Sequence, residues 1–430
     1  MKKHILFGQE AVLPAALKKY RAQLGDSLWS AMGLLVLNIA LQIVVFPLLA
    51  RLFGESGYGE IQYLSAYLNI FSLSVGAAAT LARMTVPLDR RLECNGDFHW
   101  ILIVASLLGA PVILLICRFG GVWMDTVTAV CYYLLFVLMM LRSYVDVSYK
   151  LTLRYRRYFI FYCCVGAGYA LGVWLVLKTR IWPLALLPGE LFGVMFAYIA
   201  DGTLRRRALR PSPLFGTAAK AMLLLCLSEG LSYLIANADR LILKFLIGAS
   251  AVTVYYLATL LGKTMTLITI PLGGVLIGYL TRYEGRLSRR AVKWMLLGSL
   301  LCVAVFTCLC VLGGYVMLWL LYPAEFDAVR PFLLVGSLSE VIFFTANILS
   351  VILVRFAKKS YQVIINGSFA ACFFGIGIPA TLYGGLWGFA LAIVAANALR
   401  WLLCILLAFH WSRKSSDTAA APVSCENEVV

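Results

Sequence analysis

Charge is what this sequence lacks most. Charged residues make up 13% of its 430 positions, whereas ordinary soluble domains carry about 25%. Hydrophobic residues make up 62% of the chain, and a soluble fold has no means of covering that much apolar surface. The composition therefore excludes an ordinary soluble domain and predicts an all-α protein that crosses a membrane many times.

Histidine is also scarce, and the three histidines do not form a cluster. His4, His99 and His410 lie far apart, and none has metal-ligand spacing to a cysteine. The cysteine pair Cys163-Cys164 and the Cys308-x-Cys310 motif lie in apolar runs, so we interpret them as packing residues. No acid/base cluster stands out either. We therefore expect neither an enzyme nor a metal cofactor. If transport is driven by an ion gradient, we expect a proton or a sodium ion to drive it.

Basic residues outnumber acidic ones: the chain has 37 Lys and Arg against 20 Asp and Glu, which gives it a formal net charge of +17. The basic residues form short clusters between apolar runs, which favours orientation in a membrane over nucleic acid as the explanation. Membrane lipids, not nucleic acid, are the expected surroundings. The bias of most basic loops to one side predicts that both termini lie in the cytoplasm.

Apolar runs of about 20 residues, the length that spans a bilayer, recur along the chain. Reading them with the basic loops predicts about twelve spans. Their approximate limits are 28–50, 59–81, 100–116, 126–147, 159–177, 181–200, 218–237, 251–280, 291–320, 331–354, 361–383 and 385–410.

The longest cytoplasmic connection falls at the midpoint of the chain, and it is basic and contains Pro211 and Pro213. It divides the chain into two six-helix lobes. We predict lobes at 1–204 and 218–414, a basic linker at 205–217 and a disordered cytoplasmic tail at 415–430. The outward loops are short, so no outward domain is available for chemistry.

The two lobes look like repeats. A shift of 194 residues places Gly54 on Gly248 and Asn69 on Lys263. Each glycine follows one apolar helix and precedes another, as at the first hairpin of each half of a duplicated transporter.

These two hairpins also carry a family resemblance. Residues 50–59 read ARLFGESGYG, and the second lobe has NADRLIL at 237–243, then Gly248 and Tyr255-Tyr256-x-Ala258. The first segment resembles the A-R-x-L-G-x-x-G-Y-G signature of Wzx-type polysaccharide flippases, with Phe53 in place of leucine. The second resembles the family's D-[RK]-x-x-[LI] and G-x-Y-x-x-A segments.

The resemblance implies a MATE-like, V-shaped, alternating-access exporter of the multidrug/oligosaccharidyl-lipid/polysaccharide superfamily. Its expected substrate is an oligosaccharide on undecaprenyl pyrophosphate, for O-antigen, capsule or exopolysaccharide. The glycan would pass from the cytoplasmic to the outer leaflet of the bacterial inner membrane. A polysaccharide polymerase and chain-length machinery are the protein partners that this function implies.

Ionisable groups at membrane depth are costly and usually face a cavity or a partner. Lys263, in the middle of its span, is a candidate for binding the pyrophosphate, and a structural pair with Glu229 is the alternative. Arg83 ends its span and either receives the headgroup or snorkels to the surface. Asn69 is a polar candidate of the same span, and Arg400 lines a cavity or pairs between helices.

Arg142 lies four residues from Asp146 on one helix face, so we expect the two to pair internally, with substrate binding by Arg142 as the alternative. Three carboxylates, Glu190, Glu229 and Glu340, are candidates for ion coupling because burial raises a carboxyl pKa. The alternative for them is pairing with Lys263 or Arg400.

Two other functions stay open. A multidrug or peptidoglycan-precursor exporter of the same superfamily differs in substrate, although the precursor flippase normally has two further spans. A membrane glycan polymerase or ligase would need a sizeable outward loop, and none is predicted.

Overall fold

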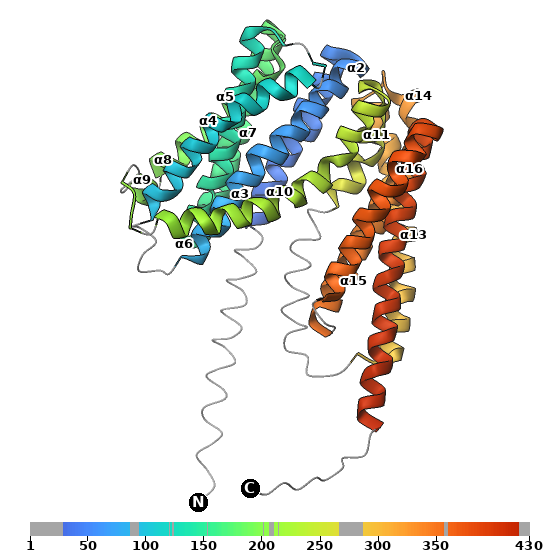
Figure 1. Ribbon diagram of the computed structural model, residues 1–430. Coiled ribbons are helices and arrows are strands. Elements are labelled where there is room, and N and C mark those ends of the chain that lie inside the picture. Colours follow the sequence, from blue (N-terminus) through green and yellow to red (C-terminus); the bar gives the residue numbers. More distant parts are fainter. Residues whose placement is uncertain are drawn as a thin grey trace, which may run out of the picture. The chain divides into compact units, whose positions relative to one another are not determined.

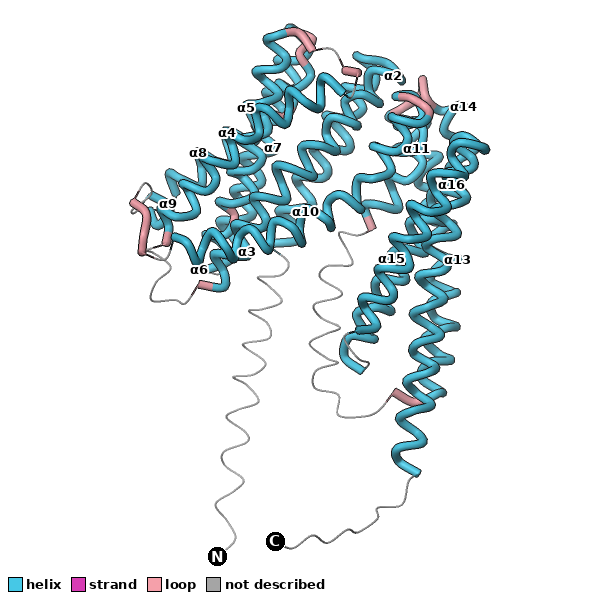
Figure 2. Tube along the Cα trace, in the orientation of Figure 1, coloured by secondary structure: helices cyan, strands magenta, loops and turns pink. Residues whose placement is uncertain are grey.

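The computed structural model describes residues 29–86, 94–119, 121–122, 124–152, 154–200, 202–205, 210–213, 215–265, 287–356 and 360–420. All regular secondary structure in these ranges is helical (Figures 1 and 2). The chain forms two compact units, Met1–Leu241 and Ile242–Val430. The prediction of an all-α protein is confirmed.

Unit 1 begins with a helical hairpin, Trp29–Thr85, which contains two π-helical segments. The segments of the hairpin are η1 (Ala40–Val45), α2 (Phe46–Tyr67), η2 (Leu68–Leu73) and α3 (Ser74–Thr85). The elements that follow are α4 (Asn95–Phe119), α5 (Thr126–Val145), α6 (Val147–Thr152), α7 (Tyr155–Thr179), η3 (Trp182–Ala185), α8 (Leu187–Ala200) and α9 (Gly202–Arg205).

Helix α10 (Phe215–Leu246) contains the boundary between the two units. The helices of unit 2 are α11 (Ala249–Thr264), α13 (Arg289–Leu321), α14 (Phe326–Val329), η4 (Arg330–Phe332), α15 (Leu333–Phe356) and α16 (Ser360–Ala420). The predicted lobe and linker limits remain predictions. Helix α16 continues six residues into the segment predicted as a tail.

The predicted spans agree with these helices. Within the described ranges, eight helices are long and apolar enough to cross a membrane. The first and last of them are hairpins divided at Gly54 and Gly385. The shorter helices α8 and α11 complete the predicted pattern, although residues 266–280 of the eighth span lie outside the described residues. The chain is a multi-pass membrane protein.

Helix α13 shows how one span fits a bilayer. Its exposed face is apolar and has Trp294 and Trp319 near its two ends, 63% and 72% exposed. At about 1.5 Å of rise per residue the two indoles lie roughly 37 Å apart along the helix axis. This is close to the separation of the two interfacial zones of a bilayer, where tryptophan is enriched.

The repeat alignment is supported by backbone geometry. Gly54 has φ 70° and ψ −179°, and Gly248 has φ 134° and ψ 178°. Both lie in a region of φ/ψ space that is essentially restricted to glycine. The same kind of tight reversal therefore joins the first two spans of each half, at the positions that the shift of 194 residues predicts.

Close helix packing positions the buried charges of each unit. In unit 1, α8 packs against α5 and α7, and a Cβ on Gly168 of α7 would lie 2.5 Å from the Cα of Gly189. In unit 2, α15 packs against α11, α13 and α16, as Figure 1 shows. There a Cβ on Gly262 of α11 would lie 2.3 Å from the Cβ of Glu340. Small residues thus let these helices approach closely, as is typical of membrane interfaces.

Candidate functional site

Unit 1 contains a buried ion pair between two of the predicted site residues. The Arg142 Nε of α5 donates to Glu190 Oε2 of α8, and the two side chains are 10% and 1% exposed. Tyr169 of α7 donates from its hydroxyl to Glu190 Oε1 over 2.6 Å. The predicted pairing of Arg142 with Asp146 is therefore wrong, as is the pairing of Glu190 with Lys263 or Arg400.

Glu190 lies at the start of a short helix. The 14 residues of α8 extend about 21 Å, which is less than the roughly 30 Å of the hydrocarbon core. A 3₁₀ turn, η3, precedes the helix and packs against α5 and α7. Glu190 lies in the first turn of α8, where the helix dipole favours a carboxylate.

Asp146 has different partners. Lys150 Nζ lies 3.0 Å from Asp146 Oδ2, and the Tyr158 hydroxyl donates to the same oxygen over 3.4 Å. Tyr158 is in turn hydrogen-bonded to Tyr162 at 3.3 Å. Unit 1 therefore holds two neighbouring ion pairs, each with a tyrosine hydroxyl that donates to its carboxylate, while Asp146 Oδ1 is buried without a hydrogen-bond partner.

Arg83 lies near the end of α3 and is buried, with 3% of its surface exposed. Its Nη1 donates to the Tyr144 hydroxyl over 2.8 Å, and its Cζ lies 5.5 Å from the centre of the Tyr144 ring. Its Nε has no hydrogen-bond partner, and no carboxylate lies within 4 Å in the described ranges. A snorkelling arginine would be exposed, so the burial of Arg83 argues against the snorkelling alternative.

Arg400 is the corresponding case in unit 2, where it is 8% exposed. Its guanidinium lies beside two neighbouring phenyl rings, 4.8 Å from the centre of Phe343 and 5.4 Å from that of Phe369. Its Nη2 donates to Asn366 Oδ1 over 3.1 Å, while its Nε is unsatisfied. Of the carboxylates in the described part of the chain, none forms an ion pair with Arg400.

Lys263 and Glu340 come from neighbouring helices of unit 2. Lys263 is half-buried near the end of α11, and its Nζ lies 6.0 Å from the centre of the Tyr256 ring. Glu340 lies against Gly262, the residue that precedes Lys263. The close α11–α15 packing thus brings two of the predicted site residues to the same level of unit 2.

Asn69 lies in the π-helical segment η2, and its Nδ2 donates to Asn237 Oδ1 of α10 over 3.1 Å. π-Helical segments occur frequently at functional sites. Glu229, two turns before Asn237 on α10, is half-buried. The structure thus places Asn69 against α10 within unit 1.

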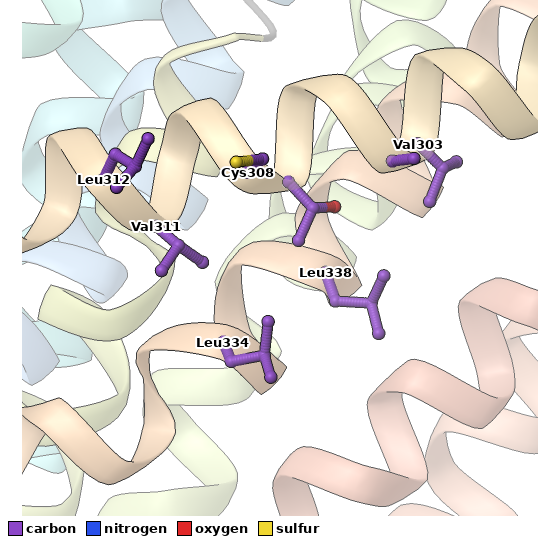
Figure 3. A pocket seen from close by; sticks show the side chains of 8 residues that line it. Val303, Cys308, Val311, Leu312, Leu334 and Leu338 are labelled. Atoms are coloured by element: carbon purple, nitrogen blue, oxygen red, sulfur yellow. The ribbon is translucent and has the colours of Figure 1, made fainter.

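An apolar groove of about 400 Å³ lies between α13 and α15 (Figure 3). It is lined by leucine and valine side chains together with Thr307 and Cys308. No charged residue lines it, so it does not provide a site for an anion.

Several partners were not predicted from the sequence, namely Tyr144, Tyr169, Phe343 and Phe369. The chain has 22 tyrosines and 24 phenylalanines, so their presence in a span does not distinguish a ring that covers an arginine from a packing residue. The burial of Arg83, Arg142 and Arg400 was the signal that a partner was needed.

Neither a protein-family profile nor a curated protein matches the chain. Solved structures do. An inward-facing multidrug resistance MATE family transporter of the MOP superfamily has a TM-score of 0.65 and 14% identity over 92% of this chain and 100% of that one. The chain has the fold of these transporters.

Two further structures agree with this MATE-like fold. Lipid II flippase MurJ, in an inward closed conformation, has a TM-score of 0.59 and 11% identity over 96% of this chain and 93% of that one. The MATE transporter VcmN of Vibrio cholerae, in its bent form, has a TM-score of 0.54 and 13% identity over 92% and 97%. At these identities the likeness establishes the fold, while the substrate must be inferred from the residues of this chain.

Proposed function

We propose that the protein is a flippase of the Wzx type, which moves an undecaprenyl-pyrophosphate-linked oligosaccharide from the cytoplasmic to the outer leaflet of the bacterial inner membrane. Its fold supports membrane export by alternating access, and one protein of this fold is a lipid II flippase. The proposal differs from multidrug export in the class of substrate, because the proposed lipid-linked oligosaccharide carries a pyrophosphate.

One observation carries the proposal: each unit buries an arginine without an ion-paired carboxylate in the described part of the chain. These residues are Arg83 and Arg400. Burying a cation without a counter-ion is expensive, and such residues usually mark a substrate or ion pathway. A pyrophosphate would supply the missing negative charge, and a guanidinium is well suited to bind it bidentately.

Within this function we propose Arg83 and Asn69 as substrate-binding residues of unit 1, and Lys263 and Arg400 as substrate-binding residues of unit 2. Arg142 is the exception among the predicted site residues, because Glu190 already neutralises it. We therefore propose a structural role for Arg142 and Glu190. The remaining carboxylates, Glu340 beside Gly262 and Glu229 on α10, are then the candidates for ion coupling. The coupling ion would be a proton or a sodium ion.

Multidrug export is the second candidate, because MATE transporters share this fold. A glycan polymerase or ligase has no such structural support. The proposed exporter would work beside a polysaccharide polymerase and its chain-length machinery in the inner membrane.

The test is deletion of the gene in its native host. The flippase proposal predicts undecaprenyl-linked repeat units that accumulate on the cytoplasmic side, with loss of the surface glycan. Unchanged surface glycan together with increased drug sensitivity would favour multidrug export instead.

Complementation with variants then assigns residues. Lys263→Ala should fail to restore the surface glycan, while Lys263→Arg, which keeps the charge, should restore part of it. Normal glycan in the alanine variant would remove Lys263 from the proposed site.

A further inference from the structure

The first turn of α4 holds together three segments of unit 1 that come much later in the chain. Asn95, Asp97 and His99 are all buried, at 0%, 0% and 8% exposure. Polar residues in the first turn of a membrane helix would ordinarily face the aqueous boundary. Their burial indicates that these three side chains contact other segments of the protein instead.

Asp97 binds the end of the interlobe connection. The Ser212 backbone N–H donates to Asp97 Oδ1 over 2.6 Å, and the Ser212 hydroxyl donates to Oδ2 over 2.6 Å. Both carboxylate oxygens are therefore used by a single residue that lies between Pro211 and Pro213. Hydrogen bonds to an ionised acceptor are the stronger kind.

Asn95 and His99 bind residues that precede the same connection. Asn95 Nδ2 donates to the carbonyl of Leu204, a fully buried residue of α9, over 2.9 Å. His99 Nε2 lies 2.6 Å from the Tyr198 hydroxyl near the end of α8. The basic stretch between Leu204 and Ser212 is thus bounded on both sides by anchored residues.

We propose that the first turn of α4 is a clasp that fixes the interlobe linker to unit 1 throughout the working cycle. The linker then moves with unit 1 as one body, and movement between the units takes place beyond Pro213, at or after α10. This agrees with the unit boundary, which falls inside α10 at Leu241. Asp97 acts as a positioning residue, and the proposal does not depend on the substrate.

Trypsin provides the first test, because the linker contains Arg205, Arg206 and Arg207, whereas Pro211 blocks cleavage after Arg210. In the purified full-length protein, Asp97→Ala should increase the rate of linker cleavage about tenfold, since local opening limits proteolysis. Asp125→Ala is the matched control, because it removes an exposed carboxylate of unit 1 that does not contact the linker, and its cleavage rate should equal that of the wild type.

If Asp97→Ala does not fold, Ser212→Ala gives the same comparison, with a smaller increase because the backbone bond to Asp97 remains. Cleavage of the folded variants at the wild-type rate would overturn the clasp.

A covalent clasp tests the second half of the proposal. Cys94 Sγ lies 3.9 Å from Ser212 Oγ, so Ser212→Cys places two thiols within reach of a disulfide. The other native cysteines are replaced, and spin labels are attached at Leu177 of unit 1 and Leu382 of unit 2, which are 49% and 64% exposed. The comparison protein carries the same labels with Ser212 intact and Cys94→Ser.

Double electron–electron resonance in nanodiscs then reports the distances between the units. The proposal predicts the same distribution with and without the disulfide, because the linker does not need to leave α4. A disulfide that removes one of the populations would show that the linker undocks when the units move, and would overturn the proposal.

Discussion

Removal of Glu190 should destabilise the protein more than removal of any other carboxylate discussed above. Glu190 is 1% exposed and is the ion-pair partner of Arg142, which has no second carboxylate within 4 Å in the described residues. Glu190→Ala leaves a buried guanidinium uncompensated, which costs about 3–5 kcal/mol. The Tyr169 hydroxyl loses its acceptor as well, for about 1 kcal/mol more.

The assay is equilibrium unfolding in mixed micelles with SDS, combined with a double-mutant cycle. Glu190→Gln keeps an oxygen that accepts a hydrogen bond, so its loss of unfolding free energy should be smaller than that of the alanine variant. The double variant Arg142→Met with Glu190→Met removes both charges and should lie within about 1 kcal/mol of the wild type, as replacement of buried pairs by apolar residues often does. The assignment of a buried pair would be refuted if the loss of unfolding free energy in the double variant equalled the sum of the losses in the two single variants. A loss below about 1 kcal/mol for Glu190→Ala would refute it as well.

Three further outcomes follow from local geometry. Gly54→Ala should lower the unfolding free energy by about 1–3 kcal/mol, because alanine does not tolerate φ 70° with ψ −179°. Asn69→Ala and Asn237→Ala should show a coupling of about 0.5–1.5 kcal/mol in a double-mutant cycle, and independent effects would contradict their hydrogen bond. Hydrogen bonding from Thr128 at the start of α5 lowers the pKa of Asp125 below its usual value, so its contribution to stability is present above about pH 3.9 and is lost as the pH falls further. The difference in thermal unfolding midpoint between the wild type and Asp125→Asn should therefore be measurable at pH 7 and should shrink at pH 3, and a constant difference would contradict it.

The helical layout could be predicted because it depends on local information. Apolar runs of sufficient length and glycine-rich connections identify spans without any knowledge of tertiary contacts. Gly54 and Gly248 illustrate this, since their backbone conformation is a property that the residue type itself permits. The orientation that the basic clusters between the runs predict stays a prediction.

Tertiary partners could not be predicted in the same way. Arg142 and Asp146 share a helix face, and that proximity suggested a pair, yet Arg142 pairs with Glu190 because α8 packs against α5. Which carboxylate pairs with an arginine depends on where a short helix begins relative to the helices that it packs against. The length of a hydrophobic run does not contain that information.

The clasp at α4 shows the same limit for a loop. Pro211 and Pro213 suggested a linker between the lobes, and the composition of the segment gave no sign of the contact between Ser212 and Asp97. A hydrogen bond between residues more than a hundred positions apart requires the fold before it can be proposed.

The central claim is that buried arginines without carboxylate partners bind an anionic lipid headgroup. The most direct measurement is binding of an undecaprenyl-pyrophosphate-linked oligosaccharide to the purified protein by native mass spectrometry, for the wild type and Arg400→Gln. The account predicts that Arg400→Gln weakens binding at least tenfold, which corresponds to about 1.4 kcal/mol or more, with no loss of the folded protein. Equal binding by the two proteins, or no binding by the wild type, would contradict it.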